Sequence, residues 1–315
     1  MKIVVTGCAG FIGANFSEYI LDNYSSDIVV GIDCLTYAAS EKALSCLKGY
    51  KNFIFYRADI CDKTEMERIF DIESPDAVVN FAAESHVDRS FIDPDIFMRT
   101  NVHGTGVLLE AANKYKVKHF HQISTDEVYG DMPLDAVDRF TESSRLNPNS
   151  PYSVSKATAD VLVLDFSEKQ GVSASISRST NNYGKYQHTE KLIPMAINRI
   201  LSDQSVTIYG DGSNMRDWLY VLDHCRAVDM IIRAGKRGIY NVGAGNEWSN
   251  VDLVKRIIAL LDRPDGAIKF VEDRKNHDRR YPVCCEKIMR ELDWRPEADF
   301  EVKLKETVEW YRDRR

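Results

Sequence analysis

Two residues near the middle of the chain have the types and spacing that alcohol oxidation requires. Tyr152 and Lys156 lie four positions apart, so on a helix both side chains would project from one face. A nearby ammonium stabilises a phenolate and would lower the pKa of Tyr152 below its free value of about 10. Transfer of a hydride from an alcohol to a nicotinamide needs such a base. Because the same spacing is common on solvated helix faces, the pair predicts catalysis only beside a cofactor site.

A glycine-rich turn after the first apolar run predicts that cofactor site. Residues 6–13 read TGCAGFIG and contain Gly7, Gly10 and Gly13. Such glycines allow a tight turn, a close approach of the backbone to a pyrophosphate and close packing of helix on strand, and the helix N-terminus attracts the phosphates. Asp33 follows Gly13 by 20 residues, where an acidic side chain can bind the ribose hydroxyls and repel a 2′-phosphate. The pattern therefore predicts NAD rather than NADP.

The composition excludes several classes of protein. The chain has 315 residues and a formal net charge of −7, so it offers no basic field for nucleic acid or an anionic membrane. Its 7 cysteines include no C-x-x-C pair, which argues against a disulfide scaffold and a structural zinc site, and no metal site is predicted. The sequence has no signal-peptide pattern and no apolar run of about 18 residues. We expect a soluble cytoplasmic protein with reduced thiols.

Short apolar runs alternate with amphipathic stretches in the first half of the chain. The runs lie at residues 2–6, 27–32, 53–57, 77–81 and 119–124, and the helical stretches at 14–23, 63–71, 98–115 and 152–169. Continuous apolar strands are typical of a sheet buried on both faces, and strands alternating with helices indicate βαβ units. Since such crossovers are right-handed, we predict an α/β fold with a Rossmann-type doubly wound parallel sheet.

The alternation weakens after about residue 180. Residues 181–190 are polar and are predicted to form a loop, followed by helical patterns at 192–202 and 251–261 and short strands at 206–209 and 268–271. No low-complexity linker separates the two halves. We therefore expect an NAD-binding domain over residues 1–180 and a smaller mixed α/β substrate-binding lobe over residues 181–315, with the two interwoven.

Motifs spread over nearly the whole chain resemble those of extended short-chain dehydrogenase/reductases that act on nucleotide sugars. The narrower resemblance is to the dTDP-glucose 4,6-dehydratase family. The glycine turn and Y-x-x-x-K occur throughout the wider family, whereas two runs are much more specific: FAAESHVDRS at 81–90 and STDEVYGD at 124–131. The other matching runs are DCLTYA at 33–38, NNYG at 181–184, EKLIP at 190–194, IYG at 208–210, RDWLYV at 216–221 and DRRY at 278–281.

The resemblance implies the loss of water from a nucleoside-diphosphate-glucose, with dTDP-glucose as the first candidate. Oxidation at C4 acidifies the C5 proton, a base removes that proton, and an acid protonates the departing C6 hydroxyl. By resemblance, Tyr152 is the base for the C4 alcohol, and Lys156 assists it. Glu127 is the base at C5, Asp126 is the acid at C6, and Thr125 positions the C4 oxygen. The hydride returns to C6, so NAD is recycled and the product is a 4-keto-6-deoxy sugar.

The resemblance also implies two sets of binding residues and a homodimer. Besides Tyr152 and Lys156, the NAD set is Gly7, Gly10, Phe11, Ile12, Gly13, Asp33, Cys34, Leu35, Thr36, Asp59, Ile60, Phe81, Ala82, Ala83, Ser85 and Thr100. The set for the nucleotide sugar is Ser85, Thr125, Asn181, Lys191, Leu192, Thr207, Tyr209, Arg216, Asn250, Arg274 and His277. Family members usually dimerise through two helices per subunit, here residues 98–115 and 152–169.

Departures from the family pattern leave the nucleotide base open. They occur at residues 185–189, 275–276 and 281–285, around the expected nucleotide site. The base is thymidine, uridine or another, and the substrates considered are dTDP-glucose and UDP-glucose. The alternatives are a UDP-sugar 4,6-dehydratase, a nucleotide-sugar 4-epimerase, a decarboxylase and a non-catalytic NAD-binding regulator. A regulator would typically have lost the tyrosine or the lysine, and the evidence against it is the joint retention of Thr125, Asp126, Glu127, Tyr152 and Lys156.

Overall fold

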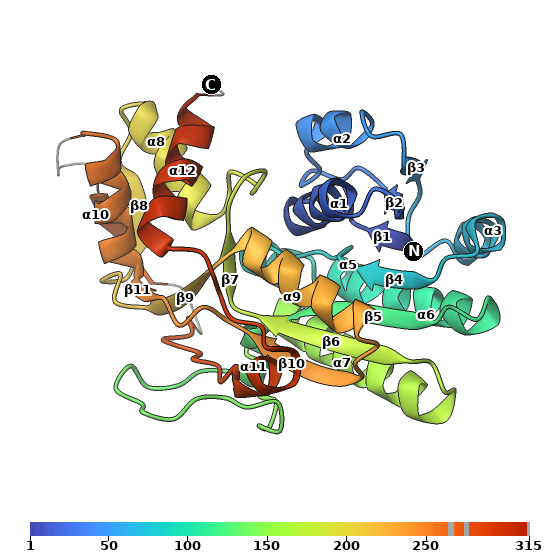
Figure 1. The fold of residues 1–315 in the computed structure, drawn as a ribbon. Coiled ribbons are helices and arrows are strands. Elements are labelled where there is room, and N and C mark those ends of the chain that lie inside the picture. Colours follow the sequence, from blue (N-terminus) through green and yellow to red (C-terminus); the bar gives the residue numbers. More distant parts are fainter. Residues whose placement is uncertain (264–267, 274–276, 314–315) are drawn as a thin grey trace.

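A seven-stranded parallel sheet forms the centre of the molecule (Figure 1). The structure is a computed structural model, and it describes residues 1–263, 268–273 and 277–313. The strand order is β10-β6-β5-β4-β1-β2-β3, and the predicted Rossmann-type class is confirmed. The strands are β1 (Lys2–Thr6), β2 (Ile28–Asp33), β3 (Phe53–Arg57), β4 (Ala77–Asn80), β5 (His119–Thr125), β6 (Ala174–Ser179) and β10 (Gly238–Val242).

Helices cover both faces of this sheet (Figure 1). One face carries α1 (Phe11–Asn23), α2 (Glu41–Leu47) and α9 (Val221–Arg233), and the other carries α3 (Lys63–Glu73), α6 (Thr105–Lys114) and α7 (Pro151–Lys169). Consecutive residues of β1 enter different cores: Ile3 and Val5 pack with α1 and α9, whereas Val4 packs with the opposite helices. This alternation explains why the strands are apolar throughout.

The helix expected at 98–115 has two parts. Residues Met98–Gly104 form a π-helical segment, η1, and α6 follows from Thr105. Within η1, Asn101 donates to Ser155 Oγ at 2.9 Å and to Glu84 O at 3.0 Å, and it accepts from Glu84 N at 2.9 Å. The short helices α4 (Val87–Ile92) and α5 (Pro94–Phe97) precede it. The π-helical segment thus ties the loop after β4 to α7, near the expected catalytic residues.

The second lobe is built around two small sheets. One contains β7 (Asn181–Tyr183), β9 (Met215–Tyr220) and β11 (Glu247–Ser249), and the other pairs β8 (Val206–Tyr209) with β12 (Ile268–Val271). The helices α8 (Leu192–Leu201), α10 (Asn250–Leu260) and α12 (Phe300–Arg312) pack around a shared apolar cluster. The prediction of a loop from residue 181 is wrong for β7, because this strand is stabilised by pairing with the distant β9.

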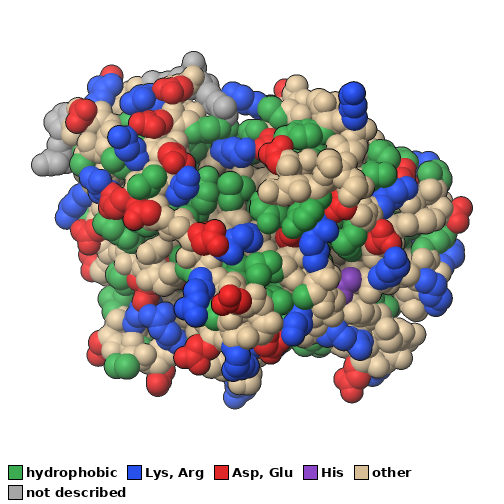
Figure 2. All heavy atoms as spheres, viewed as in Figure 1, with side chains coloured by type: hydrophobic (Ala, Val, Ile, Leu, Met, Phe, Trp, Pro, Cys, Tyr) green, Lys and Arg blue, Asp and Glu red, His purple; other side chains and the backbone are tan. Residues whose placement is uncertain are grey.

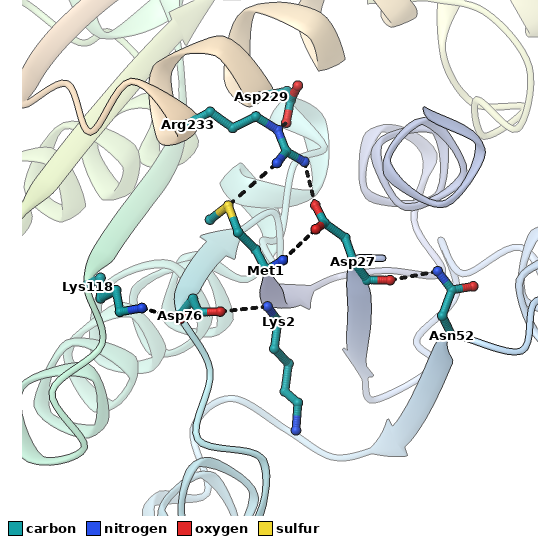
Figure 3. Close-up of polar contacts among 8 residues, drawn as sticks. All are labelled: Met1, Lys2, Asp27, Asn52, Asp76, Lys118, Asp229 and Arg233. Atoms are coloured by element: carbon teal, nitrogen blue, oxygen red, sulfur yellow. Dashed lines mark hydrogen bonds and ion pairs between the residues drawn. The ribbon is translucent and has the colours of Figure 1, made fainter. Parts of the chain in front are cut away.

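The chain returns to the first domain after residue 220. Helix α9 packs on α1, and β10 pairs with β6 at the edge of the large sheet. Figure 3 shows how α9 is anchored: Arg233 donates to Asp229 and to Asp27, each at 2.6 Å, and the amine of Met1 also contacts Asp27. These bonds join α9 to the start of β2. Residues 284–285 lead into α11 (Glu286–Leu292), which packs near β10.

The outer surface carries both signs of charge. On the face drawn in Figure 2, Lys and Arg side chains are interspersed with Asp and Glu side chains. No helix in the described ranges combines the length and the apolar character that crossing a membrane requires. A single broad basic field is not seen on this face, in keeping with the net charge of −7.

Candidate active site

The glycine turn has the shape that a phosphate cradle requires. Gly7 has a φ of +65°, and a Cβ built there would lie 2.8 Å from Ala82 N. A Cβ at Gly13 would lie 2.2 Å from the carbonyl oxygen of Gly7. Helix α1 begins at Phe11, directly after Gly10, which has no side chain to cover the free N–H groups. The turn therefore leaves the positive end of α1 accessible to an anion, as NAD binding requires.

Asp33 connects this turn to the loop after β2. Its carboxylate accepts from Ala9 N at 3.0 Å and from Leu35 N at 2.8 Å. Burial raises the pKa of Asp33, whereas these two backbone bonds act in the opposite direction. The acidic residue predicted to read the ribose thus also shapes the loop that would surround it.

The other residues predicted to bind NAD lie mainly in loops after parallel strands. Cys34 to Thr36 follow β2, Asp59 and Ile60 follow β3, and Phe81 to Ser85 follow β4. Thr100 lies in η1. The Asp59 carboxylate accepts hydrogen bonds from the Arg99 guanidinium at 2.8 Å and from Cys61 N at 2.9 Å. The structure therefore gathers the predicted set along the carboxyl edge of the sheet, where doubly wound folds bind ligands.

The acidic pair lies at the end of β5. Thr125 is the last residue of the strand, and its hydroxyl accepts from Glu127 N at 3.3 Å, which starts the short 3-10 helix η2 (Asp126–Tyr129). Asp126 is buried, and desolvation, followed by the charge of Glu127, raises its pKa well above the usual range. Glu127 is only half-buried and lines a large cavity. The two neighbouring carboxyl groups therefore occupy different environments.

Tyr152 and Lys156 lie at the start of α7. Ser150 caps this helix by accepting from Ser153 N at 3.1 Å, while the Ser153 hydroxyl bonds back to Ser150 N at 3.0 Å. Pro151 occupies the first turn, where it is pre-organised for a helix. Both Tyr152 and Lys156 are buried against the end of β5. The capping residues thus begin α7 at the position from which the side chains of Tyr152 and Lys156 pack against β5.

The electrostatics of this pair differ from the prediction. Burial raises the pKa of Tyr152, and the charge of Glu127 adds to this effect, whereas a hydrogen bond with the Thr125 side chain opposes it. The Lys156 ammonium donates to the carbonyl oxygen of Ile123 at 2.5 Å. The expected lowering of the Tyr152 pKa by Lys156 is wrong for this arrangement, because burial outweighs the other influences. Burial also lowers the pKa of Lys156, to about 8, and Asp160 partly offsets this.

A cavity of about 820 Å³ opens beside the acidic pair, between the two lobes. It is lined by most of the residues predicted to bind the nucleotide sugar: Asn181, Lys191, Leu192, Thr207, Tyr209, Arg216, Asn250 and His277. Ser85 and Thr125 are not among its described lining residues, although the Ser85 carbonyl accepts from Lys191 Nζ at 2.8 Å. Arg274 lies outside the described residues. Strands and helices far apart in sequence therefore meet at one pocket.

Arg216 is oriented by the protein itself. Its guanidinium donates to the carbonyl oxygens of Met215 at 2.7 Å and Asp278 at 2.9 Å, and it lies 4.5 Å from the ring centroid of Tyr281. The rings of Tyr209 and His277 meet edge to face, with their centroids 6.4 Å apart. The backbone bonds fix the guanidinium plane at the pocket wall.

Several described residues that line the cavity were not predicted as site residues. Among them are His86, Phe91, Ser150, Asn182, Gln187, Glu190, Met195, Arg199, Trp218, Asp278 and Tyr281. Some of these residues lie within the motifs named above, including Glu190, Trp218, Asp278 and Tyr281. Their place beside predicted site residues in the sequence could have identified them. For Phe91, Met195 and Arg199 no chemical signal in the sequence distinguishes them from ordinary helix residues.

Comparisons with known proteins agree with this geometry. The family model described as GDP-mannose 4,6 dehydratase matches residues 4–307. The dTDP-glucose 4,6-dehydratase of Shigella flexneri is 45% identical over 335 aligned positions, covering 99% of this chain and 92% of the relative. This chain belongs to the dTDP-glucose 4,6-dehydratase family. The match extends over almost the whole chain, from residue 4 to residue 307.

Solved structures place the fold within the same family. DesIV, the dTDP-glucose 4,6-dehydratase of Streptomyces venezuelae crystallised with NAD and TYD bound, superposes with a TM-score of 0.96 at 40% identity. That match covers 100% of this chain and 98% of DesIV. The UDP-glucose 4-epimerase of Thermotoga maritima matches with a TM-score of 0.92 but only 30% identity, with 99% of each chain covered. Dehydratases and epimerases therefore share this fold.

Proposed function

We propose that this protein is an NAD-dependent hydro-lyase that converts dTDP-glucose into its 4-keto-6-deoxy derivative. The observation that carries the proposal is the pair Asp126 and Glu127 at the end of β5, beside Tyr152. Burial raises the pKa of Asp126 well above the usual carboxyl range, which favours its protonated form and suits this side chain to be an acid. Glu127 lines the cavity and is suited to take a proton from the substrate. An enzyme that only inverts C4 has no need of this pair.

The first step uses Tyr152 and Thr125. Tyr152 accepts the proton of the C4 hydroxyl, and Thr125 holds the oxygen through its hydroxyl. Because burial raises the pKa of Tyr152, the side chain must first lose its phenol proton to solvent, and the phenolate so formed is a strong base for the C4 hydroxyl proton. Lys156, four residues after Tyr152 on α7, remains charged below about pH 8.

The later steps use the two carboxyl groups. NAD supplies the hydride acceptor for C4 and the hydride donor for C6 when it is bound at the glycine turn. Glu127 removes the acidified C5 proton, and Asp126 protonates the departing C6 hydroxyl. The turn at residues 7–13 fits the cofactor because a side chain at Gly7 or Gly13 would occupy the space of the cradle's own backbone. We assign the remaining NAD contacts to the loops after β2, β3 and β4.

The nucleotide occupies the cavity between the lobes. Lys191 and Arg216 bring positive charge to its wall, as a diphosphate requires, and Asn181 and Asn250 bring amide groups. Tyr209 and Thr207 are assigned to the nucleobase and ribose. Thymidine is the proposed base, supported by 45% identity to a protein named for dTDP-glucose against 30% to one named for UDP-glucose.

The exposed apolar side chains near α7 support a homodimer. Ile92 on α4 is 84% exposed and Val161 on α7 is 59% exposed, and Ile96, Met98 and Val154 extend the same region. The helices that carry these side chains contact one another, and exposed apolar side chains that gather in one region are typical of a protein interface. We also propose a cytoplasmic location, in keeping with the unpaired state of all seven cysteines.

The test offers dTDP-glucose and UDP-glucose, each deuterated at C4, to the purified protein with catalytic NAD. We expect dTDP-glucose to lose one molecule of water, as seen by mass spectrometry, and its product to carry deuterium at C6. Asp126→Asn serves as the matched control and should convert little substrate. Deuterium released into free NADH would identify a dehydrogenase instead, and deuterium retained at an inverted C4 would identify an epimerase. A preference for UDP-glucose would overturn the assignment of the base.

A further inference from the structure

A buried line of serine and histidine side chains runs along the large sheet and ends at the cavity. It lies between neighbouring strands β5 and β6 and helix α9, on the same face of the sheet. Successive side-chain atoms are 3.1, 2.7, 2.7, 3.0, 3.3 and 3.0 Å apart. In order, its members are Ser173, His119, Ser175, His121, Ser177, His224 and Asn182. We name it the Ser-His line.

One end of the line is fixed by Asn182, which lines the cavity. Its amide nitrogen Nδ2 donates to the carbonyl oxygen of Thr180 at 2.9 Å and to Ser179 Oγ at 3.2 Å. Since a carbonyl oxygen only accepts, the amide orientation is determined, and Oδ1 is the atom that faces His224. Asn182 therefore holds the turn between β6 and β7, next to Asn181.

The orientation of Asn182 determines every other proton of the line. The Nδ1 atom of His224 must donate to Asn182 Oδ1, so in a neutral ring its Nε2 accepts from Ser177. Ser177 has used its one proton and must accept from His121 Nε2. The same argument continues through Ser175 and His119 to Ser173, which donates at the half-buried end. All donors thus point toward the cavity.

The rings must be neutral for this arrangement. A doubly protonated ring donates at both nitrogens and would break the line at its own position. Burial lowers the pKa of His119 to about 4 and that of His224 to about 3, and it lowers the pKa of His121 well below its usual value. The line is therefore uncharged near neutral pH, and its direction is set by hydrogen bonding alone.

We propose that His121, Ser177 and His224 are positioning residues for the nucleotide-sugar site: they hold the β6–β7 turn so that Asn181 presents its amide to the substrate. This inference rests on the proposed function for the identity of the ligand. The physical reason is the number of bonds that hold the buried His224 ring: without Ser177, its Nε2 atom loses its donor, and only the bond from Nδ1 to Asn182 Oδ1 remains. A ring held at one nitrogen instead of two restrains Asn182, and with it the turn, less firmly.

The first test reads the line directly and needs no substrate. Nitrogen NMR of the protein labelled at histidine distinguishes the two neutral tautomers. We expect the proton on Nδ1 in His224 and on Nε2 in His121 and His119. In Ser177→Ala, His224 should keep its Nδ1 proton on Asn182, whereas His121 loses the acceptor of its Nε2 proton and should shift toward the Nδ1–H form that can donate to Ser175. His224 protonated on Nε2 in the unaltered protein would overturn the proposal.

The second test measures steady-state kinetics with dTDP-glucose. Ser177→Ala should raise KM about tenfold while kcat stays within about twofold, since one neutral hydrogen bond is lost away from the reacting atoms. Ser173→Ala is the matched control and should match the unaltered protein, because water can reach His119 at the half-buried end. His224→Leu should raise KM, because leucine neither donates nor accepts a hydrogen bond. His224→Gln retains a donor and an acceptor, so its KM should stay close to that of the unaltered protein.

Failure of the positioning role can be distinguished from failure of the proposed dehydratase function. If the unaltered protein does not convert dTDP-glucose, the proposed function fails while the tautomer measurement still stands. If Ser177→Ala changes the His121 tautomer but leaves KM unchanged, the line is structural and the positioning role is refuted. An equal loss of kcat in Ser177→Ala and Ser173→Ala would also refute it, because a general loss of packing would then explain both.

Discussion

Replacing Lys156 by methionine should stabilise the protein while abolishing its activity. Burial lowers the pKa of Lys156 from 10.5 to about 8, so keeping its charge in the folded protein near neutral pH costs about 3 kcal/mol. The hydrogen bond to the Ile123 carbonyl offsets about 1 kcal/mol of this, although that oxygen also accepts from Gln122 Nε2 at 3.3 Å. Asp160 keeps its ion pair with Arg178 at 2.9 Å. We expect a net gain of about 1–2 kcal/mol.

The pH dependence gives this prediction its sign. Between about pH 8 and about pH 10.5, the unfolded chain holds a proton that folded Lys156 has released, so the unaltered protein gains stability as the pH rises. Below about pH 8 both states are charged, and the full cost of burying the charge remains. The advantage of Lys156→Met should therefore be largest near neutral pH and disappear by about pH 10.5.

Urea titrations without NAD, at several pH values, measure this difference. Lys156→Arg is the matched control, because arginine stays charged throughout this range and should bring no stabilisation. Turnover of dTDP-glucose should be lost in Lys156→Met. If Lys156→Met is less stable than the unaltered protein near neutral pH, or if their difference does not change with pH, burial of a charged Lys156 is not the cause we describe.

Four further substitutions test the site. Glu127→Gln should abolish product formation but leave NAD affinity intact, and 4-keto-6-deoxy product at the normal rate would remove Glu127 from the mechanism. Asp126→Asn should slow turnover about 100- to 10,000-fold, since an amide is a poor proton donor, and a loss below tenfold in rapid-quench assays would contradict the acid role. Asp33→Ala should weaken NAD binding and reduce discrimination against NADP, as calorimetry with both cofactors can test; an unchanged preference would show that another group reads the ribose. Gly13→Ala places a Cβ 2.2 Å from Gly7 O, so it should destabilise the fold by about 1–3 kcal/mol and abolish NAD binding, and normal NAD affinity would refute the cradle geometry.

The elements of the first domain could be predicted because their causes are local. The strand at Lys2–Thr6 matched its prediction at both ends, and so did the strand at Phe53–Arg57. A strand buried on both faces must be apolar at every position, so its pattern appears in consecutive residues. The start of α7 was also local, since Ser150, Pro151 and Ser153 form its cap.

The second lobe was harder to predict because its strands are short and depend on distant partners. β7 has three residues and pairs with β9 more than thirty positions later in the chain. Helix α9 and strand β10 return to the first domain, where Arg233 meets Asp27. Such long-range pairing leaves little trace in the periodicity of either segment.

The sequence by itself determined which chemical groups the site contains. The glycine turn, Asp33, the acidic pair and the Tyr-Lys pair could be identified because each is a set of near neighbours whose spacing has a local reason. Tertiary structure alone decided their environments. The Lys156 ammonium was expected to lower the pKa of Tyr152, but burial raises it. The ammonium instead donates a hydrogen bond to the Ile123 carbonyl oxygen. Desolvation and hydrogen bonding depend on all the atoms packed around a group, and those atoms come from every part of the chain.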